Sequence, residues 1–241
     1  MRILITNDDG MHAAQLLPLI RWCRKLGEVT VFVPKVEQSG KSHSFEIREP
    51  FEVKQVALAP DVTIWSVNST PADCVRIAVL GMKMEFDLVI SGINRGLNIG
   101  RDIMYSGTVS AVFEAANLNV NAMAVSTTPA YYDSAVEEMD KIWDFIMERD
   151  LFSKNDMWNV NIPTGGSDKF RFTRQGGNYY SDNFRPDPED MYFPCGIDVF
   201  TPCGSKELDT DTVLVDKVIS VMPLTLDRTN LELYKQLTAA L

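Results

Sequence analysis

The stretch LITNDDG, residues 4–10, joins an apolar, β-branched run to two adjacent carboxylates. Residues 3–6 predict a buried strand, because a short apolar run that is rich in isoleucine favours extended structure. Asp8 and Asp9 follow almost at once, and neighbouring carboxylates repel each other unless a positive group lies between them. The stretch therefore predicts a strand that ends in a loop with two unbalanced negative charges.

Strand and helix patterns alternate outward from this stretch through the first two-thirds of the chain. Apolar runs predict further strands at 29–34, 63–67, 86–90, 122–127 and 158–163. Helical spacing predicts helices at 13–23, 69–82, 105–118 and 136–146. Because strands that alternate with helices form parallel βαβ units, we expect an α/β fold with a doubly wound, mostly parallel sheet.

Two segments interrupt this alternation. Pro18 lies inside the first helical pattern, so that helix either begins late or carries a kink. Residues 44–57 alternate around Pro50 and predict a hairpin or an edge insertion.

The last third of the chain has a different texture, with many prolines, glycines, aromatic residues and short β-like runs. Its segments predict a loop at 186–190, strand structure at 212–224 and a terminal helix at 230–241. We therefore expect a core at 1–155 and a β-rich extension with a C-terminal helix at 156–241, which belong to one domain unit.

The composition limits the classes of function. The chain has 241 residues and a formal net charge of −10, which argues against broad binding to nucleic acids or to anionic membranes. Its four cysteines are widely spread and form no CxxC pair, so neither a zinc site nor a disulfide framework is indicated. No signal-peptide pattern is present, and no apolar run approaches the ~20 residues that span a bilayer. We expect a cytoplasmic protein.

Three polar loops follow predicted strands, at residues 6–10, 37–44 and 91–108. Each loop taken alone is interpreted as a turn or a helix cap. However, ligands of an open α/β sheet bind beyond the carboxyl ends of its strands, where these loops meet. They supply carboxylate, hydroxyl and amide oxygens, the ligands of a hard divalent cation such as Mg²⁺. The run 106–108 also precedes a helix, whose free N–H groups bind anions.

Other catalytic motifs are absent from the sequence. His12 and His43 are its two histidines, and they form no legible Ser-His-Asp arrangement. His43 either lines the site or is a solvated loop histidine. The sequence contains no P-loop and no GxGxxG after the first strand. Arg95 and Arg101 either contact an anionic substrate or are solvated at the surface, and the sequence leaves both alternatives open.

Five segments of the sequence resemble the SurE (survival protein E) family of metal-dependent nucleotidases. They are ILITNDDG (3–10), QSG (38–40), STPADCV (69–75), DLVISGINRGLNIGRDIMYSGTVSAVFEAA (87–116) and WNVNIP (158–163). The resemblance covers nearly the whole chain.

The resemblance implies a metal site, a phosphate site and an activity. Asp8 and Asp9 would bind one divalent ion, Mg²⁺ or Mn²⁺, with the Ser39 hydroxyl and the Asn94 amide oxygen. Asn98 and the run Ser106–Gly107–Thr108 would hold the phosphate. The activity implied is hydrolysis of nucleoside 5′- and 3′-monophosphates and of short polyphosphate. The fold implied is a Rossmann-like core with a β-rich C-terminal part that helps to build homodimers or homotetramers.

Two stretches depart from the family pattern. After NDDG the family usually continues with a small residue and Ala-Pro-Gly, whereas residues 11–15 read MHAAQ. The run VFEAA at 112–116 replaces a run of small residues. Neither stretch includes an implied metal or phosphate position, so both bear on substrate shape and assembly.

Catalysis is assigned to the two aspartates, of which Asp9, or else Asp8, orients or deprotonates the attacking water. The alternative is a Mg²⁺-binding, receiver-like signalling domain without phosphatase turnover. A receiver needs an aspartate at the end of its third strand, whereas Asp87 precedes its strand. A haloacid-dehalogenase-type phosphatase needs an Asp-x-Asp pair, whereas the two aspartates here are adjacent.

Overall fold

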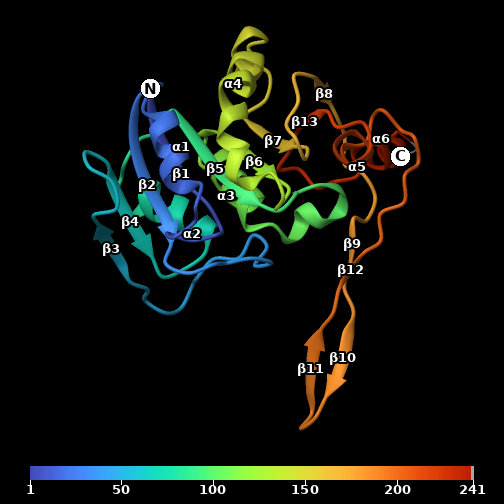
Figure 1. Ribbon diagram of the computed structural model, residues 1–241, viewed down its shortest axis with the longest axis horizontal. Coiled ribbons are helices and arrows are strands. Elements are labelled where there is room, and N and C mark those ends of the chain that lie inside the picture. The colour runs from blue at the N-terminus through green and yellow to red at the C-terminus, as the bar shows by residue number, and fades with distance from the viewer. Residues whose placement is uncertain (240–241) are drawn as a thin grey trace.

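A nine-stranded sheet runs through the computed structural model, which describes residues 1–239 (Figure 1). In spatial order the strands are β3 (Val53–Val56), β4 (Thr63–Val67), β2 (Glu28–Pro34), β1 (Arg2–Thr6), β5 (Leu88–Arg95), β6 (Asn121–Thr127), β7 (Met157–Ile162), β13 (Ile219–Pro223) and β8 (Phe170–Phe172). Neighbouring strands are parallel except β3 with β4 and β13 with β7. The predicted α/β class with a mostly parallel sheet is confirmed.

The order of the parallel strands is that of a Rossmann-like fold. From β4 through β2 and β1 to β5, β6 and β7, the chain fills one side of β1 first and then the other. The carboxyl ends of β1 and β5 therefore flank the point where the strand order reverses. Ligands of such sheets bind at this switch point.

Helices cover both faces of the sheet (Figure 1). One face carries α1 (Leu16–Cys23), the 3₁₀ helix η3 (Tyr132–Glu138) and α4 (Met139–Glu148). The other face carries α2 (Pro71–Arg76), the π-helix η1 (Ile77–Gly81) and α3 (Gly107–Asn117). Two further 3₁₀ helices are η2 (Gly100–Tyr105) and η4 (Leu151–Ser153). The alternation of Ile3 and Ile5 with Leu4 along β1 supplies both apolar faces.

The local rules for helix starts explain two of these helices. Because α1 begins at Leu16, Pro18 lies in its first turn, where amides have no acceptor within the helix; the late start is confirmed. The Thr70 hydroxyl accepts a hydrogen bond from the Asp73 amide at 3.2 Å, and Pro71 takes the first position of α2. The expected helix at 136–146 is in part wrong, because its first residues belong to η3.

Two strand predictions are in part wrong for identifiable reasons. Of the two alternatives expected at 44–57, the edge insertion is found, because β3 forms an edge strand of the sheet. The hairpin is not found, because one Glu46 carboxylate oxygen accepts hydrogen bonds from the amides of residues 47, 48 and 49 and holds a local turn. The strand expected at 212–224 starts only at Ile219. Residues 212–214 belong to α5 (Asp209–Leu214), whose first turn carries two aspartates that favour a helix N-terminus.

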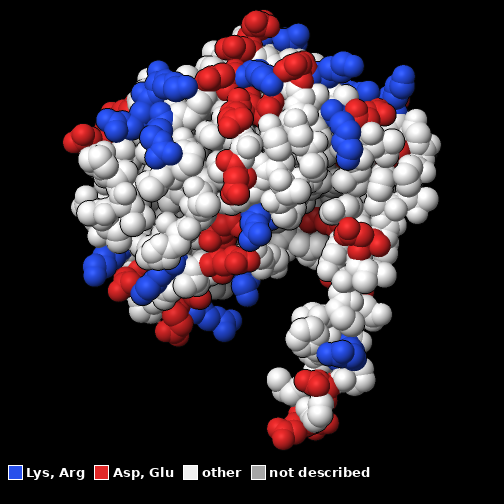
Figure 2. All heavy atoms as spheres, viewed as in Figure 1, with Lys and Arg blue, Asp and Glu red and all other residues white. Residues whose placement is uncertain are grey.

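A two-stranded arm projects from the body of the protein (Figures 1 and 2). It consists of β9 (Tyr180–Ser181) with β12 (Ile197–Asp198) and of β10 (Phe184–Asp187) with β11 (Met191–Pro194), both antiparallel. The loop expected at 186–190 is in part wrong, because its first two residues belong to β10. The side chains of Phe184, Met191, Tyr192 and Phe193 are exposed on this arm.

The terminal helix is confirmed as α6 (Leu231–Thr238), capped by the Asn230 side chain, while residues 240 and 241 of the expected range lie outside the described residues. None of its side chains is buried. Across residues 1–239 no helix has the length and apolar character required to cross a membrane. The boundary expected at residue 155 stays a prediction.

Candidate active site

The NDDG loop after β1 is closed by its own first side chain. Asn7 is buried; its Oδ1 accepts a hydrogen bond from the Gly10 amide at 3.0 Å, and its Nδ2 donates to the Gly10 carbonyl at 3.1 Å. The Met11 amide donates to the Pro34 carbonyl at 2.9 Å and fastens the loop to the end of β2. The two carboxylates between Asn7 and Gly10 are thus held on a fixed turn at the switch point.

The Asp8 side chain points toward the first turn of α3. Only 4% of Asp8 is exposed, and its Oδ1 accepts a hydrogen bond from the Thr108 hydroxyl. A Cβ atom added at Gly107 would lie 2.9 Å from the Asp8 Cβ, so only a glycine allows this approach. Burial raises the pKa of the Asp8 carboxyl, and the hydrogen bond from Thr108 opposes this rise.

The Asp9 side chain lies beside a cavity. The Arg95 amide at the end of β5 donates a hydrogen bond to its Oδ2 at 3.1 Å. Burial, followed by the charge of Asp8, raises the pKa of Asp9 to about 6. The cavity measures about 350 Å³, and its wall includes Ala13 and the Tyr132 ring.

The end of β5 is irregular where it reaches the site. Its pairing with β6 shifts between Ser91 and Asn94, as in a β-bulge. Gly92 lies there with φ +139°, and an added Cβ would lie 2.4 Å from the Val125 carbonyl oxygen. Asn94 is half-buried and its Nδ2 donates to the Gly96 carbonyl at 2.9 Å, which leaves Oδ1 as the free end of the amide. A bulge of this kind changes the direction of the side chains that follow it, here that of Asn94, which the resemblance assigns to the metal.

Ser39 lies on the exposed loop after β2. Its hydroxyl donates to the Glu37 carboxylate at 2.7 Å. The Gln38 amide next to it donates to the Asp8 carbonyl at 2.8 Å, which ties this loop to the NDDG turn. The structure thus brings the chain neighbours of Ser39 and Asn94 against the two aspartates. Within residues 1–239, no hydrogen bond joins the Ser39 or Asn94 side chain itself to either carboxylate.

The donor set fits a hard divalent cation. The side-chain contacts use Oδ1 of Asp8 and Oδ2 of Asp9, which leaves one oxygen of each carboxylate for an ion. In the described part of the chain, no lysine or arginine pairs with either carboxylate, and no group of three or more His, Cys, Asp or Glu could hold a metal. Two carboxylates with amide and hydroxyl oxygens suit Mg²⁺ or Mn²⁺ rather than zinc.

The run 106–108 forms the N-terminus of α3. The Ser106 hydroxyl caps this helix by accepting a hydrogen bond from the Val109 amide at 3.1 Å. Amides in the first turn have no acceptor within the helix, so those of Gly107 and Thr108 are available to bind an anion. Because Thr108 also contacts Asp8, the predicted metal position and the predicted phosphate position share one boundary.

Asn98 is held by a buried amide network. Its backbone amide donates to the Asn161 Oδ1 at 2.8 Å, and its carbonyl accepts from Asn159 and Asn161 at 2.8 and 3.0 Å. Its own Nδ2 donates to the Ser126 hydroxyl at 2.7 Å, which leaves the second amide proton available. This network fixes the loop between β5 and η2.

The segment after Asn98 is joined to residues 175–180, here called the arm root, which lead into the arm. The Arg101 amide donates to the Gly177 carbonyl at 3.0 Å, and the Tyr180 amide donates to the Asp102 carboxylate at 2.8 Å. Asp209 is fully buried, and its carboxylate accepts hydrogen bonds from the Gly100 amide at 2.9 Å and from the Gly176 amide of the arm root at 2.8 Å. Helix η2 and the arm root therefore form one unit.

Replacing Asn161 with Ala is expected to lower the free energy of unfolding by about 1–3 kcal/mol, because the Asn98 amide loses its buried acceptor. Urea denaturation measures this change. The matched control is Asn183→Ala, whose exposed side chain accepts a hydrogen bond from the amide of Phe184, the next residue. Equal midpoints for the two variants would contradict the role of this network.

Several of these supporting residues were not identified from the sequence. Asn159 and Asn161 alternate inside a buried strand, and two amides on one face of such a strand are a readable signal of a polar network. Asn7 in the NDDG turn is likewise a typical turn-closing residue. The contacts of Asp209 with the amides of Gly100 and Gly176 give no local signal, because both residues lie more than 30 positions away in the chain.

Comparisons with known proteins agree with this geometry. A family model described as Survival protein SurE matches residues 3–182. The chain is 36% identical to the 5′-nucleotidase SurE of Caldanaerobacter subterraneus subsp. tengcongensis over 253 residues, which covers 98% of this chain and 96% of that protein. It is 37% identical to the 5′-nucleotidase SurE of Desulforudis audaxviator over 243 residues, which covers 96% and 94%.

A solved structure with the same arrangement is the crystal structure of the SurE protein from Aquifex aeolicus. The two chains superpose with a TM-score of 0.80 at 29% identity, and the match covers 100% of this chain and 99% of the other. The resemblance seen in the NDDG and SGINRG segments thus extends over the whole fold. This chain belongs to the SurE family.

Proposed function

We propose that this protein is a metal-dependent phosphomonoesterase that hydrolyses nucleoside 5′-monophosphates to nucleoside and phosphate. The names of its full-length relatives support this activity. The observation that carries the proposal is the contact between Thr108 and Asp8, because it sets a carboxylate pair against a helix N-terminus at the switch point. A cation and a phosphate group would meet at this place.

One divalent ion, Mg²⁺ or Mn²⁺, would be held by Asp8, Asp9, Ser39 and Asn94, and it would supply Lewis-acid polarisation of the phosphoryl oxygens. Asn98 and the amides that begin α3 would bind the phosphate oxygens and stabilise charge in the transition state. Asp9 is the better candidate for orienting the water, since it opens on the cavity whereas Asp8 is buried against Thr108.

The proposal extends to nucleoside 3′-monophosphates and to short polyphosphate. The family resemblance supports this extension. The cavity beside Asp9 is lined by charged residues together with Ala13, Ala14 and the Tyr132 ring. The cytoplasmic location, and the absence of nucleic-acid and membrane partners, stay predictions.

A homodimer or homotetramer is proposed as the assembled form. The exposed apolar side chains of the arm and the unburied helix α6 support it, because a protruding two-stranded ribbon is only marginally stable alone. The receiver-like alternative is not supported by the order of the strands. Receivers have the strand order 2-1-3-4-5, whereas the parallel strands here follow 3-2-1-4-5-6.

A phosphate-release panel tests the proposed activity. The purified chain, freed of metal with EDTA, is resupplied with Mg²⁺ or Mn²⁺ and incubated with nucleoside 5′- and 3′-monophosphates, short polyphosphate and an artificial phosphomonoester. We expect release from the 5′-monophosphates only after a metal is added. Equal release in EDTA, or metal binding without any turnover, would overturn the proposal.

A further inference from the structure

The loop at 35–50 must hold one proposed metal ligand in place although it contains no helix or strand. It carries Ser39, which the proposed function assigns to the metal, yet Ser39 is exposed and no helix or strand includes it. Among residues 1–239, its hydroxyl forms a hydrogen bond only with Glu37 of the same loop. A ligand in such a loop binds well only when the loop is held elsewhere, because ordering it on metal binding costs free energy.

Hydrogen bonds to its backbone hold the loop on both sides of Ser39. On one side the Gln38 amide donates to the Asp8 carbonyl at 2.8 Å. On the other side the Ser42 amide donates to the Tyr105 carbonyl at 3.0 Å, and the Ser42 carbonyl accepts from the Ser110 hydroxyl of α3 at 2.9 Å. The free stretch between these anchors is three residues long.

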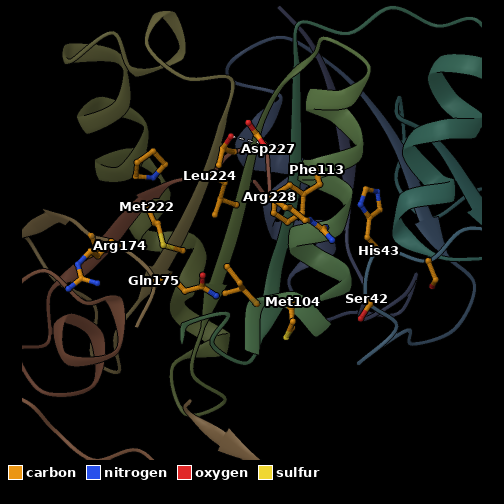
Figure 3. A pocket seen from close by; sticks show the side chains of 15 residues that line it. Ser42, His43, Met104, Phe113, Arg174, Gln175, Met222, Leu224, Asp227 and Arg228 are labelled. Carbon is orange, nitrogen blue, oxygen red and sulfur yellow. Dashed lines mark hydrogen bonds between the residues drawn. The ribbon is translucent and has the colours of Figure 1, made fainter. Parts of the chain in front are cut away.

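The next residue carries a side-chain contact to a buried carboxylate. The His43 Nε2 lies 2.9 Å from the Glu114 Oε2, and the His43 ring stacks on Phe113 of α3 with centroids 6.2 Å apart. Figure 3 shows His43 beside the helix that carries Phe113, on the wall of a cavity of about 760 Å³. The Glu114 side chain itself is only 3% exposed.

The second carboxylate oxygen of Glu114 forms a salt bridge with an arginine. Arg76 of α2 donates to the Glu114 Oε1 at 3.0 Å, so both carboxylate oxygens are engaged. Burial acts to raise the pKa of Glu114, but the contacts with His43 and Arg76 outweigh it and hold the pKa below its ordinary value. The Arg76 guanidinium also lies over the Phe45 ring, 4.5 Å from its centroid, which secures the loop further along.

These contacts give α3 two tasks. Its first turn forms the proposed phosphate site, and Glu114, two turns later, fixes the loop that supplies Ser39. We propose that Glu114 with His43 and Arg76, here called the latch, is a positioning unit that holds Ser39 in register with the phosphate site. The inference rests on the proposed function, since it concerns the metal assigned there.

Replacing His43 with Ala tests the latch without touching a proposed metal or phosphate position. We expect the affinity for Mn²⁺, measured by calorimetric titration of the metal-free full chain with MnCl₂, to fall about tenfold, as for loss of an outer-shell partner. The turnover number at saturating Mn²⁺ is expected to change much less, because the liganded arrangement is the same.

Two companion variants set the scale. Ile47→Ala changes an exposed side chain of the same loop and is expected to leave the Mn²⁺ affinity unchanged. His43→Gln places an amide nitrogen near the position of the imidazole Nε2 and is expected to recover a measurable part of the affinity. Thermal midpoints in EDTA report any general loss of stability.

The decisive comparison uses a Ser39→Ala background. If His43 acts through Ser39, His43→Ala weakens Mn²⁺ binding in the natural chain but adds nothing once Ser39 is replaced. An equal further loss in both backgrounds would overturn the latch in favour of a general structural role. Undiminished Mn²⁺ affinity of His43→Ala, while the natural chain binds the metal, would overturn the latch alone. A natural chain that binds no Mn²⁺ would overturn the latch and the proposed function together.

Discussion

Replacing Asp8 with Asn is expected to lower metal-dependent phosphate release by more than ~100-fold, since losing a direct ligand exceeds the loss of an outer-shell partner. The amide has the shape of the carboxyl and can still accept the hydrogen bond from Thr108. It lacks the negative charge that a divalent ion requires. The kcat/KM for a nucleoside 5′-monophosphate in excess Mg²⁺ measures the effect.

The same substitution makes a separate prediction for the metal-free protein. Burial raises the pKa of Asp8, so its charged form is disfavoured in the empty fold and a neutral amide should not destabilise it. The thermal midpoint in EDTA is therefore expected to stay equal or to rise. Asp144→Asn is the matched control, because Asp144 is exposed on α4 and does not line the cavity beside Asp9. Full turnover by Asp8→Asn in resupplied Mg²⁺ would refute the assignment.

Replacing Gly107 with Ala is expected to lower kcat/KM by roughly 10–100-fold, the range for disturbing groups that support a metal ligand. The new Cβ would lie 2.9 Å from the Asp8 Cβ and 3.2 Å from both Asp8 Oδ2 and a Pro71 ring carbon. The Asp8 turn is closed by Asn7, and Pro71 begins α2, so the first turn of α3 must shift instead.

The Gly107 variant separates site geometry from fold stability. Alanine is the better helix former, so the local helix propensity does not suffer. Gly177→Ala is the matched control, since nothing lies within 4 Å of the added Cβ there. Steady-state kinetics with a metal titration and thermal midpoints are compared for both variants. A Gly107→Ala enzyme with unchanged metal dependence and turnover would show that α3 does not form the site boundary.

The sequence predicts the layered fold because each element carries its own period. The strand at 3–6 and the helical face of α3 are readable from spacing alone, and both are found. The turn held by Glu46 and the helix at 209–214 are not readable in this way. In the first case the Glu46 carboxylate binds three local backbone amides, which overrides the pattern of apolar residues. In the second case Asp209 also binds the amides of Gly100 and Gly176, which are distant in the chain.

The candidate site divides in the same manner. Asp8, Asp9 and Asn94 are predictable as neighbours because the carboxyl ends of β1 and β5 share one edge of the sheet. The groups that hold them are harder to predict. The apolar face of α3 predicts the helix but says nothing about Glu114. The contacts of its two carboxylate oxygens with His43 and Arg76 are seen only in the structure.

The junction between η2 and the arm root has a consequence for how the length of this chain can vary. Residues 175–180 carry hydrogen bonds to the segment that follows Asn98, so an insertion or deletion there also shifts the loop that is proposed to bind phosphate. Beyond residue 181 the ribbon bonds mainly to itself. The length of the tip is therefore free to vary between descendants of one ancestor. The root is held in place by its hydrogen bonds to the segment after Asn98.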